Sequence, residues 1–167
     1  MRKKIISVVS AMLVMCTMFC SSLINVRAEE TVTKMVDGSY LTMAESSTAE
    51  TAYNPLLRGV HLMDGTVTIS KAGVKKIFVY ASTTADHDVD NIAVDVFVEE
   101  YDPEDDAWKQ IDFWSADDKN DYYVVTQKTV YVDGGHYYRV RCDHYAWNDE
   151  DTLVDSSGTI TDGIWVD

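Results

Sequence analysis

Short runs of alternating apolar and polar residues, separated by turn residues, fill most of the chain after residue 59. The clearest run places Ile92, Val94, Val96 and Val98 at every second position. A period of two puts alternate side chains on opposite faces of a β-strand, and no segment shows the helical period of about 3.6 residues. Further runs lie at residues 66–70, 76–81, 107–115, 123–132 and 159–166. We therefore predict an all-β domain of about seven to eight strands, arranged as an antiparallel β-sandwich.

The stretch Val130–Trp147 has the pattern expected of a central hairpin. Two strand-like runs meet at Asp133-Gly134-Gly135, where glycine accepts the positive φ that a tight turn needs. In the second run, the residues expected to face the core are Tyr138, Val140, Cys142 and Ala146. Those expected on the other face are Tyr137, Arg139, Arg141 and Asp143. Such a strand would be about twice the usual length, so a bulge or an end is expected near Asp143–His144.

The same stretch carries the motif of a tyrosine corner, Asp133-x-Gly135-x-Tyr137, although the alternation makes Tyr138 the inward tyrosine. This part of the chain resembles fibronectin type III and immunoglobulin-like domains, where a Tyr-x-Val-x-Val/Cys strand follows a glycine-containing turn. More broadly, residues 58–167 carry the succession RGVHLMDG, TISKAG, STTAD, GGHYYRVR and DGIWV. That succession resembles small secreted proteins of Gram-positive bacteria that are grouped as a domain of unknown function. Both resemblances imply a β-sandwich and neither transfers a catalytic residue.

The first 28 residues have the composition of a secretory signal peptide. Basic residues at positions 2–4 precede an apolar run over Ile5–Phe19, and Val26-Arg27-Ala28 predicts cleavage after Ala28. The apolar run is short for a membrane anchor of about 20 residues. Neither Cys16 nor Cys20 follows the small residue that a lipoprotein signal needs. We expect a secreted protein with a signal peptide at 1–28, an N-terminal linker or partly ordered segment at 29–58 and a β-sandwich domain at 59–167.

The chain is strongly acidic, with a formal net charge of −14. Cleavage after Ala28 would remove four basic residues and no acidic one, which takes the charge to −18. Nucleic acids and anionic membranes bind clustered Lys and Arg, so neither is an expected partner. The charge favours solubility, a bound cation or a basic partner.

Cysteine and histidine give little support for catalysis. After cleavage Cys142 would be the one remaining cysteine, which excludes an intramolecular disulfide. Cys142 and His144 share a predicted strand face, a spacing that could hold a metal or pair a thiolate with a base. The alternative is core packing, because Cys142 lies in the apolar alternation. The sequence has no phosphate-binding loop, Gly-x-Ser-x-Gly elbow or HExxH spacing, so an enzyme is not expected and no catalytic residue is assigned.

An acidic segment offers a candidate calcium site. Asp86, Asp88 and Asp90 alternate as in a calcium loop, but Asn91 and Phe97 stand where an EF-hand has glycine and glutamate. Together with acidic segments in other predicted loops, at residues 102–106, 117–121 and 148–151, these residues could supply the roughly six to eight oxygen ligands that Ca²⁺ prefers. The alternative is a solvated turn, because Asp and Asn favour turns.

Two aromatic faces are candidate ligand-binding surfaces. Trp108 and Trp114 would share one face of a strand that turns Ala107, Ile111 and Phe113 toward the core. The second face would combine Tyr137, Arg139, Arg141, Tyr145 and Trp147. Such faces bind glycans or proteins because aromatic rings give a large contact area at small entropic cost. The alternative is that the tryptophans fill the core and that cross-strand aromatic pairs stabilise the sheet.

These observations support two hypotheses about function. The first is a secreted non-enzymatic binding module for a glycan or a protein at the cell exterior. The second is a structural or accessory extracellular domain, with or without stabilisation by calcium, that has no small-molecule ligand. Apart from Ca²⁺, no cofactor is expected.

Overall fold

The computed structural model describes residues 34–51, 62–149 and 155–167. Within these ranges the chain contains strands and turns and no helix, which confirms the predicted all-β class. The predicted signal peptide, with Cys16, Cys20 and the cleavage site after Ala28, lies outside the described residues. A search of the described ranges for a helix long and apolar enough to cross a membrane finds none.

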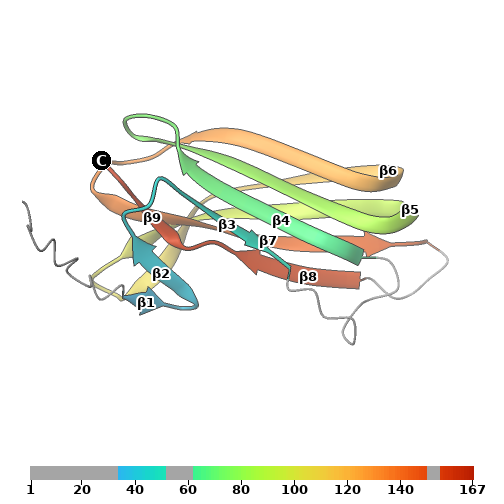
Figure 1. The fold of residues 1–167 in the computed structure, drawn as a ribbon, viewed down its shortest axis with the longest axis horizontal. Helices are drawn as coiled ribbons and strands as arrows, with labels where there is room; N and C mark the ends of the chain where they lie inside the picture. The colour runs from blue at the N-terminus through green and yellow to red at the C-terminus, as the bar shows by residue number, and fades with distance from the viewer. Residues whose placement is uncertain (1–33, 52–61, 150–154) are drawn as a thin grey trace, which may run out of the picture. The chain divides into compact units, whose positions relative to one another are not determined.

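The described residues form nine strands (Figure 1). Three short strands come first, namely β1 (Met35–Val36), β2 (Ser39–Thr42) and β3 (Ser46–Glu50). They are followed by β4 (Leu62–Lys71), β5 (Lys76–Asp102), β6 (Ala107–Tyr131) and β7 (His136–Trp147). The last two are β8 (Asp155–Ile160) and β9 (Gly163–Val166).

The strands form one mixed sheet that curls into a half-barrel. The hydrogen-bonded order is β1-β2-β9-β7-β5-β4-β3, with β6 beside β5 and β8 beside β7. Among the described pairs, β2 with β9 is parallel, with Leu41 opposite Gly163, and the others are antiparallel. The prediction of a purely antiparallel sheet is wrong for this pair, because β2 and β9 enter the sheet in the same direction.

The strands β5 and β6 form a long two-stranded ribbon that bends back on itself (Figure 1). Their register shifts between Thr84 and Val89, and beyond this point β5 leaves β4 and pairs with β7. Across the bend the Thr83 hydroxyl donates a hydrogen bond of 3.0 Å to the carbonyl oxygen of Ala93. The strand β5 therefore contributes to both walls of the half-barrel, and the core lies between them.

The apolar alternation along β4, β5 and β7 is confirmed by burial. Inward residues of β5 are odd-numbered up to Ala85 and even-numbered from Ile92, because the irregular segment between Thr84 and Val89 changes the parity. The buried residues that the alternation predicted are Val67, Ile69, Ile77, Val79, Ala81, Ile92, Val94, Val96, Val98, Tyr138, Val140, Cys142 and Ala146. Each buried Val or Ile stabilises the fold by roughly 1.5–3 kcal/mol relative to an exposed one.

The predicted turn at Asp133-Gly134-Gly135 is present, but the two strands that it joins do not pair with each other as a hairpin. Gly135 has φ +86°, and its N–H donates to the Val166 carbonyl oxygen at 2.7 Å. The end of β6 pairs with the start of β5, whereas β7 pairs with the end of β5, so the described parts of β6 and β7 share no ladder. The turn carries the chain from one wall to the other. The bulge or end expected near Asp143–His144 is also wrong, since β7 pairs with β5 without a register shift there.

Three strands lie in the segment 29–58, where a linker or partly ordered segment is predicted. The strand β3 pairs with β4 from Ser46 opposite Ser70 to Glu50 opposite Thr66. Its one apolar residue is alanine, so no apolar alternation marks it in the sequence. Backbone pairing at the sheet edge therefore forms a strand that its side chains do not predict.

Candidate functional site

A β-bulge divides the first half of β6. Val98 of β5 pairs with Asp112, whereas the next residue, Glu99, pairs with Gln110, which leaves Ile111 as an extra residue. An extra residue on one strand moves the side chains beyond it to the opposite face of the sheet. On one side of Ile111 the odd-numbered residues of β6 therefore face inward, and on the other side the even-numbered residues do.

The bulge separates the two tryptophans of β6. Trp114 lies on the inner face opposite Val96, whereas Trp108 lies on the outer face. Ile111 and Phe113 are 45% and 47% exposed. The prediction that the tryptophans share a face, with Ile111 and Phe113 in the core, is therefore wrong.

Trp108 is held beneath the hairpin formed by β1 and β2. Its indole N–H donates to the Val36 carbonyl oxygen at 3.0 Å, and the guanidinium carbon of Arg139 lies 4.5 Å from the ring centroid. The ring also lies against Gly163, where an added Cβ would come within 2.5 Å of Trp108 Cη2. This indole is a packing contact within the fold and not an open platform for a sugar ring.

Trp114 is half-buried where the two halves of β6 face each other. Its indole N–H donates to Thr126 Oγ1 at 3.1 Å, and Lys128 Nζ lies 4.7 Å from the ring centroid. Lys128 also forms an ion pair with Asp112 at 2.6 Å. Trp114 and Asp112 lie in one half of β6 and Thr126 and Lys128 in the other, so these contacts follow from the bend of the ribbon. We call the line along which residues 107–118 and 123–131 of β6 face each other the β6 seam.

Arg139 is 2% exposed and joins β7 to two other elements. Its Nε donates to Glu99 of β5 at 2.7 Å. Its Nη1 donates to the Asp37 carbonyl oxygen at 2.8 Å and to Ser39 Oγ at 3.1 Å, and its Nη2 donates to Asp37 Oδ2 at 3.0 Å. Because these partners occupy the guanidinium, Arg139 holds the β1–β2 hairpin on the sheet and is not exposed to a ligand.

Arg141 lies on the same face and is more exposed. Its guanidinium carbon is 3.9 Å from the centroid of the Phe97 ring. It also donates to Asp143 at 2.8 Å, while its Nε lies 3.8 Å from Glu99. The side chain thus stacks on one neighbour and pairs with two carboxylates.

The remaining residues of the second predicted face do not form a common surface. Tyr137 packs edge-on against Trp165, with ring centroids 5.0 Å apart, and approaches Tyr101 at 6.5 Å. Tyr145 and Trp147 are half-buried nearer the other end of β7. The predicted site residues Trp108, Trp114, Tyr137, Arg139, Arg141, Tyr145 and Trp147 are therefore spread over two faces and are largely engaged in packing.

Asp90 lies where two acidic segments meet. Its N–H donates to Asn148 Oδ1 at 3.0 Å, and its carboxylate accepts from the Asp149 N–H at 2.8 Å. Asp86 instead contacts His87, and Asp88 is exposed. Among the residues that the structure describes, no group of three or more Asp, Glu, His or Cys side chains is arranged to hold a metal ion. Calcium binding by Asp86, Asp88 and Asp90 stays a prediction.

His144 forms the centre of a buried polar cluster beneath β4. The Thr83 hydroxyl already donates to a backbone carbonyl, so it accepts from His144 Nδ1–H at 2.8 Å. His144 Nε2 then accepts from the Thr159 hydroxyl at 2.8 Å. The ring lies against Gly65, where an added Cβ would stand 2.5–2.7 Å from the imidazole. These contacts fix the neutral Nδ1–H tautomer of the imidazole.

This environment opposes catalysis by Cys142 and His144. Burial lowers the pKa of His144 to about 4, against the opposing effect of Asp143 and Asp64. Burial also raises the pKa of the Cys142 thiol to about 12. A reactive cysteine needs a lowered pKa and access to solvent, whereas both side chains are 0% exposed. The interpretation of Cys142 as a core residue is confirmed.

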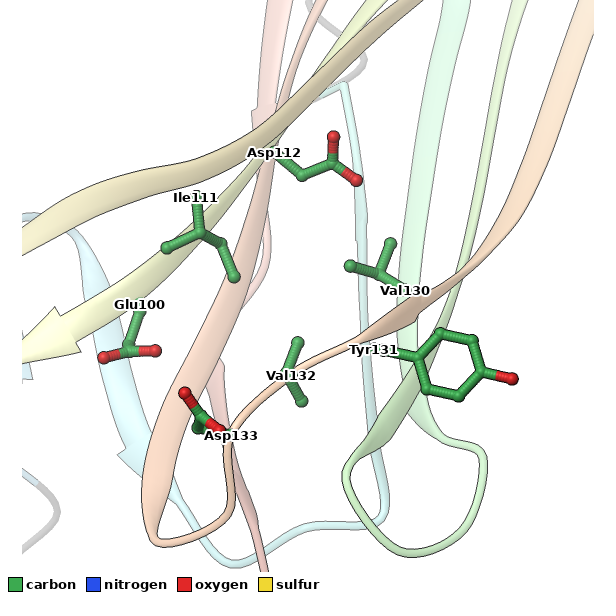
Figure 2. Close-up of a pocket in the computed structure, with 7 residues that line it drawn as sticks. All are labelled: Glu100, Ile111, Asp112, Val130, Tyr131, Val132 and Asp133. Carbon is green, nitrogen blue, oxygen red and sulfur yellow. The ribbon is translucent and has the colours of Figure 1, made fainter.

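A cleft with a volume of ≈ 440 Å³ lies at one end of the β6 seam (Figure 2). Figure 2 shows Ile111 and Val132 pointing toward each other across it, while the ring of Tyr131 points away. Three of the lining residues are acidic and none is basic. The complete lining is Glu100, Ile111, Asp112, Val130, Tyr131, Val132 and Asp133.

Tyr138 supports this cleft from the core. Its hydroxyl lies 2.8 Å from Glu100 Oε2 and 2.9 Å from the Asp133 carbonyl oxygen, so these two acceptors share its one proton. Burial, followed by the hydrogen bond with Glu100, raises the pKa of Tyr138. His136 Nδ1 lies 3.3 Å from the other oxygen of Glu100. The Glu100 carboxylate is thus held in position, and the inward orientation predicted for Tyr138 is confirmed.

The strand that borders the cleft has an unpaired edge. Over the described ranges β6 pairs with β5 alone. The Val132 N–H donates to the Lys75 carbonyl oxygen at 3.1 Å. This bond, together with the register of the β5–β6 pairing, shows which of residues 123–131 direct their backbone groups toward β5. In an antiparallel ladder, alternate residues direct both backbone groups to the same side. The residues that direct them away from β5, here called the free edge of β6, are Val125, Gln127, Thr129 and Tyr131.

The sequence predicted neither the cleft nor the free edge. Val130 and Val132 belong to a predicted strand, but Ile111 and Asp112 lie in the other half of β6. Only the bend of the ribbon brings the two halves together. The acidic segments at 86–91 and 117–121 were predicted as loops and coincide with the bend, so they are the signal from which it could have been inferred.

Comparison of the chain with family models, with curated proteins and with solved structures finds no match in any of the three. The resemblance to small secreted proteins of Gram-positive bacteria stays a prediction. The function is therefore argued from the geometry of the chain itself.

Proposed function

We propose that the chain is a secreted, non-enzymatic binding module that recognises another protein at the β6 seam. The observation that supports this most directly is the free edge of β6 beside the cleft. Natural sheets usually shorten, cover or charge their edges, because an unpaired edge pairs readily with another extended chain. Exposed apolar side chains also lie at this edge, since Val125 and Tyr131 belong to it and Ile111 lines the cleft beside it.

A protein ligand is favoured over a glycan. The tryptophans predicted to form a sugar-binding platform are not open to a sugar ring, because Trp108 lies beneath the β1–β2 hairpin and Trp114 lies on the inner face. Tyr137 packs against Trp165. An unpaired sheet edge instead offers backbone donors and acceptors, which an extended polypeptide matches along its length.

A peptide array and a glycan array, both probed with the full secreted chain, test the proposed function. We expect reproducible binding to a subset of extended peptides and none to glycans. Glycan binding with quenching of tryptophan fluorescence would assign the module to sugars. Absence of binding on both arrays would favour the structural or accessory role.

The second candidate function, a calcium-stabilised accessory domain, rests on the meeting of two acidic segments at Asp90. The hydrogen bonds of Asp90 with Asn148 and Asp149 bring these segments together without an ion. A melting temperature that rises with Ca²⁺ and falls with EDTA would support this function. A melting temperature unchanged by either would remove it.

We also propose that the curled sheet is a variant of the immunoglobulin-like or fibronectin type III-like sandwich. The contact of the Tyr138 hydroxyl with the Asp133 carbonyl oxygen, five residues upstream, supports this relation. A tyrosine corner makes the same kind of contact at the start of its strand. An experimental structure that shows a single layer around the core would contradict it.

A further inference from the structure

We infer that the ligand is an extended segment of a partner protein with basic residues at alternate positions. It would pair with the free edge of β6 and place one basic side chain in the cleft. This inference rests on the proposed function and names the chemistry of its partner.

The backbone supplies the first half of the argument. The free edge begins at Val125, because the N–H of Tyr123 is occupied by Asp121 Oδ1 at 3.1 Å. From Val125 to Tyr131 the pairing of β6 with β5 has no register shift. A regular edge of this length presents its backbone groups at the spacing of a β-strand, which an added strand can match.

The charge of the cleft supplies the second half. Its carboxylates come from Glu100, Asp112 and Asp133, and no basic residue lines it. Lys128 reaches Asp112 at 2.6 Å and Lys75 reaches Asp133 at 4.0 Å, with lysine side chains 42% and 59% exposed. Exposed ion pairs of this kind contribute little to stability. A basic side chain of the ligand can therefore replace these lysines next to the carboxylates.

The side chains beside the free edge define the remaining contacts. Val125 is 45% exposed and Tyr131 is 76% exposed, both on the outer face of β6. Apolar residues directly opposite them on an added strand would form cross-strand pairs. The ligand is therefore expected to alternate apolar residues on the outer face with basic residues directed toward the seam and its cleft.

A second copy of the chain fits this edge less well. The formal net charge of −14 makes two copies repel each other. The inward-facing Lys128 beside the free edge is also a feature that limits pairing between identical edges. A basic partner has no such repulsion.

Three synthetic peptides of about eight residues, a typical strand length, test the inference against the full chain. The first alternates Val and Lys, the second alternates Val and Glu, and the third is the Val/Lys peptide with a central proline. Binding is measured by fluorescence anisotropy at low and high salt. We expect the Val/Lys peptide to bind about tenfold or more tightly than the other two and to weaken with salt.

Methylation of the peptide backbone separates strand pairing from general charge attraction without altering the protein. One Val/Lys peptide is N-methylated at two valines and another at two lysines. In a strand, these two sets of N–H groups lie on opposite edges. We expect methylation of one set of N–H groups to reduce binding about tenfold and methylation of the other set to have little effect. Equal effects of the two sets would overturn the inference.

Two protein variants locate the site. Thr129→Pro removes an N–H of the free edge without removing one from the β5 ladder, so it is expected to fold and to bind about tenfold more weakly, with Thr129→Ala as its control. Asp112→Asn with Asp133→Asn removes two charges from the cleft and should lower the affinity. Its matched control, Asp117→Asn with Asp118→Asn, makes the same change of charge at exposed positions of β6 and should bind as the wild type does.

The outcomes distinguish the two proposals. If no peptide and no protein binds the wild-type chain, both the proposed function and this inference fail. If peptides bind regardless of charge, or bind Thr129→Pro as well as Thr129→Ala, the inference fails. The proposed function then stands only if the cleft variant Asp112→Asn with Asp133→Asn binds more weakly than its matched control.

Discussion

His144 shows how a single buried side chain couples the walls of the half-barrel to pH. Its two ring nitrogens connect Thr83 of β5 with Thr159 of β8, and its face lies against Gly65 of β4. This arrangement suits the neutral imidazole, because a proton on Nε2 would face the hydroxyl proton of Thr159. The cluster therefore stabilises the fold only while His144 is neutral.

The pKa of His144 makes the stability of the fold fall in acid. Burial lowers this pKa from 6.5 to about 4, so between these values the unfolded chain binds a proton that the folded chain does not. The stabilisation is complete above about pH 6.5 and falls by about 3 kcal/mol as the pH drops to about 4.

Urea unfolding at several pH values compares the wild type with His144→Gln. The variant is expected to lose about 1–3 kcal/mol at neutral pH and to show a flatter dependence between pH 6.5 and about 4. Contributions from carboxylates are common to both chains and cancel in the difference. Parallel curves for the two proteins would contradict the role assigned to His144.

Gly163 is expected to tolerate no side chain, because Trp108 occupies the space. An added Cβ would stand 2.5 Å from Trp108 Cη2, so Gly163→Ala must displace the indole from its contacts with Val36 and Arg139. We expect a loss of about 1–3 kcal/mol with a shift in tryptophan emission, measured by thermal unfolding and fluorescence. Gly158→Ala is the control, because its added Cβ would meet its neighbours at ordinary contact distance and should leave the emission unchanged. Gly73→Ala is unsuitable, because Gly73 has φ +113°.

At the scale of elements, the β1–β2 hairpin is attached to the sheet by the short parallel pairing of β2 with β9 and by the side chain of Arg139. The guanidinium bonds Asp37 and Ser39 of the hairpin and Glu99 of β5, and the hairpin in turn covers Trp108. Both Arg139 and Glu99 are shielded, with side-chain exposures of 2% and 12%. Removing one partner of such a pair leaves the other charge without compensation.

Arg139→Ala is therefore expected to destabilise the protein by about 3–5 kcal/mol and to loosen the hairpin, which then keeps only its pairing with β9 and nearby hydrogen bonds. Arg141→Ala is the matched control, because this side chain is 35% exposed and its ion pairs are screened by water. We expect a loss of about 1 kcal/mol or less for the control. Chemical denaturation measures both losses, and the rate of proteolysis near residues 37–45 measures the loosening of the hairpin. Equal losses would contradict the assignment.

The elements also show which parts of the fold the sequence can predict. Alternation identified the inward residues of β5 and β7 because one face of each strand is buried, and a period of two then fixes the face. It failed for β6, because a single extra residue at Ile111 reverses the face of Trp108 and nothing in the local sequence marks that bulge. It also failed for β3, whose polar strand is held by backbone pairing.

At the scale of the whole molecule, the site depends on long-range folding of one ribbon. The cleft joins Ile111 and Asp112 to Val130 and Val132 only because β5 and β6 bend together. The sequence predicted loops at the bend but not that both would belong to one continuous ribbon. The predicted hairpin at Asp133-Gly134-Gly135 failed for the same reason, since local turn chemistry does not report which strand becomes the neighbour.

The central claim is that β6 carries a free edge that an extended basic ligand covers. Amide hydrogen exchange measured by NMR tests it residue by residue, with and without the Val/Lys peptide. In the free protein we expect rapid exchange at Val125, Gln127, Thr129 and Tyr131, and slow exchange at Val124, Thr126, Lys128 and Val130, whose N–H groups face β5. The peptide should slow exchange at the first set and leave the second unchanged. Slow exchange of both sets in the free protein, or no change at the first set with saturating peptide, would contradict the claim.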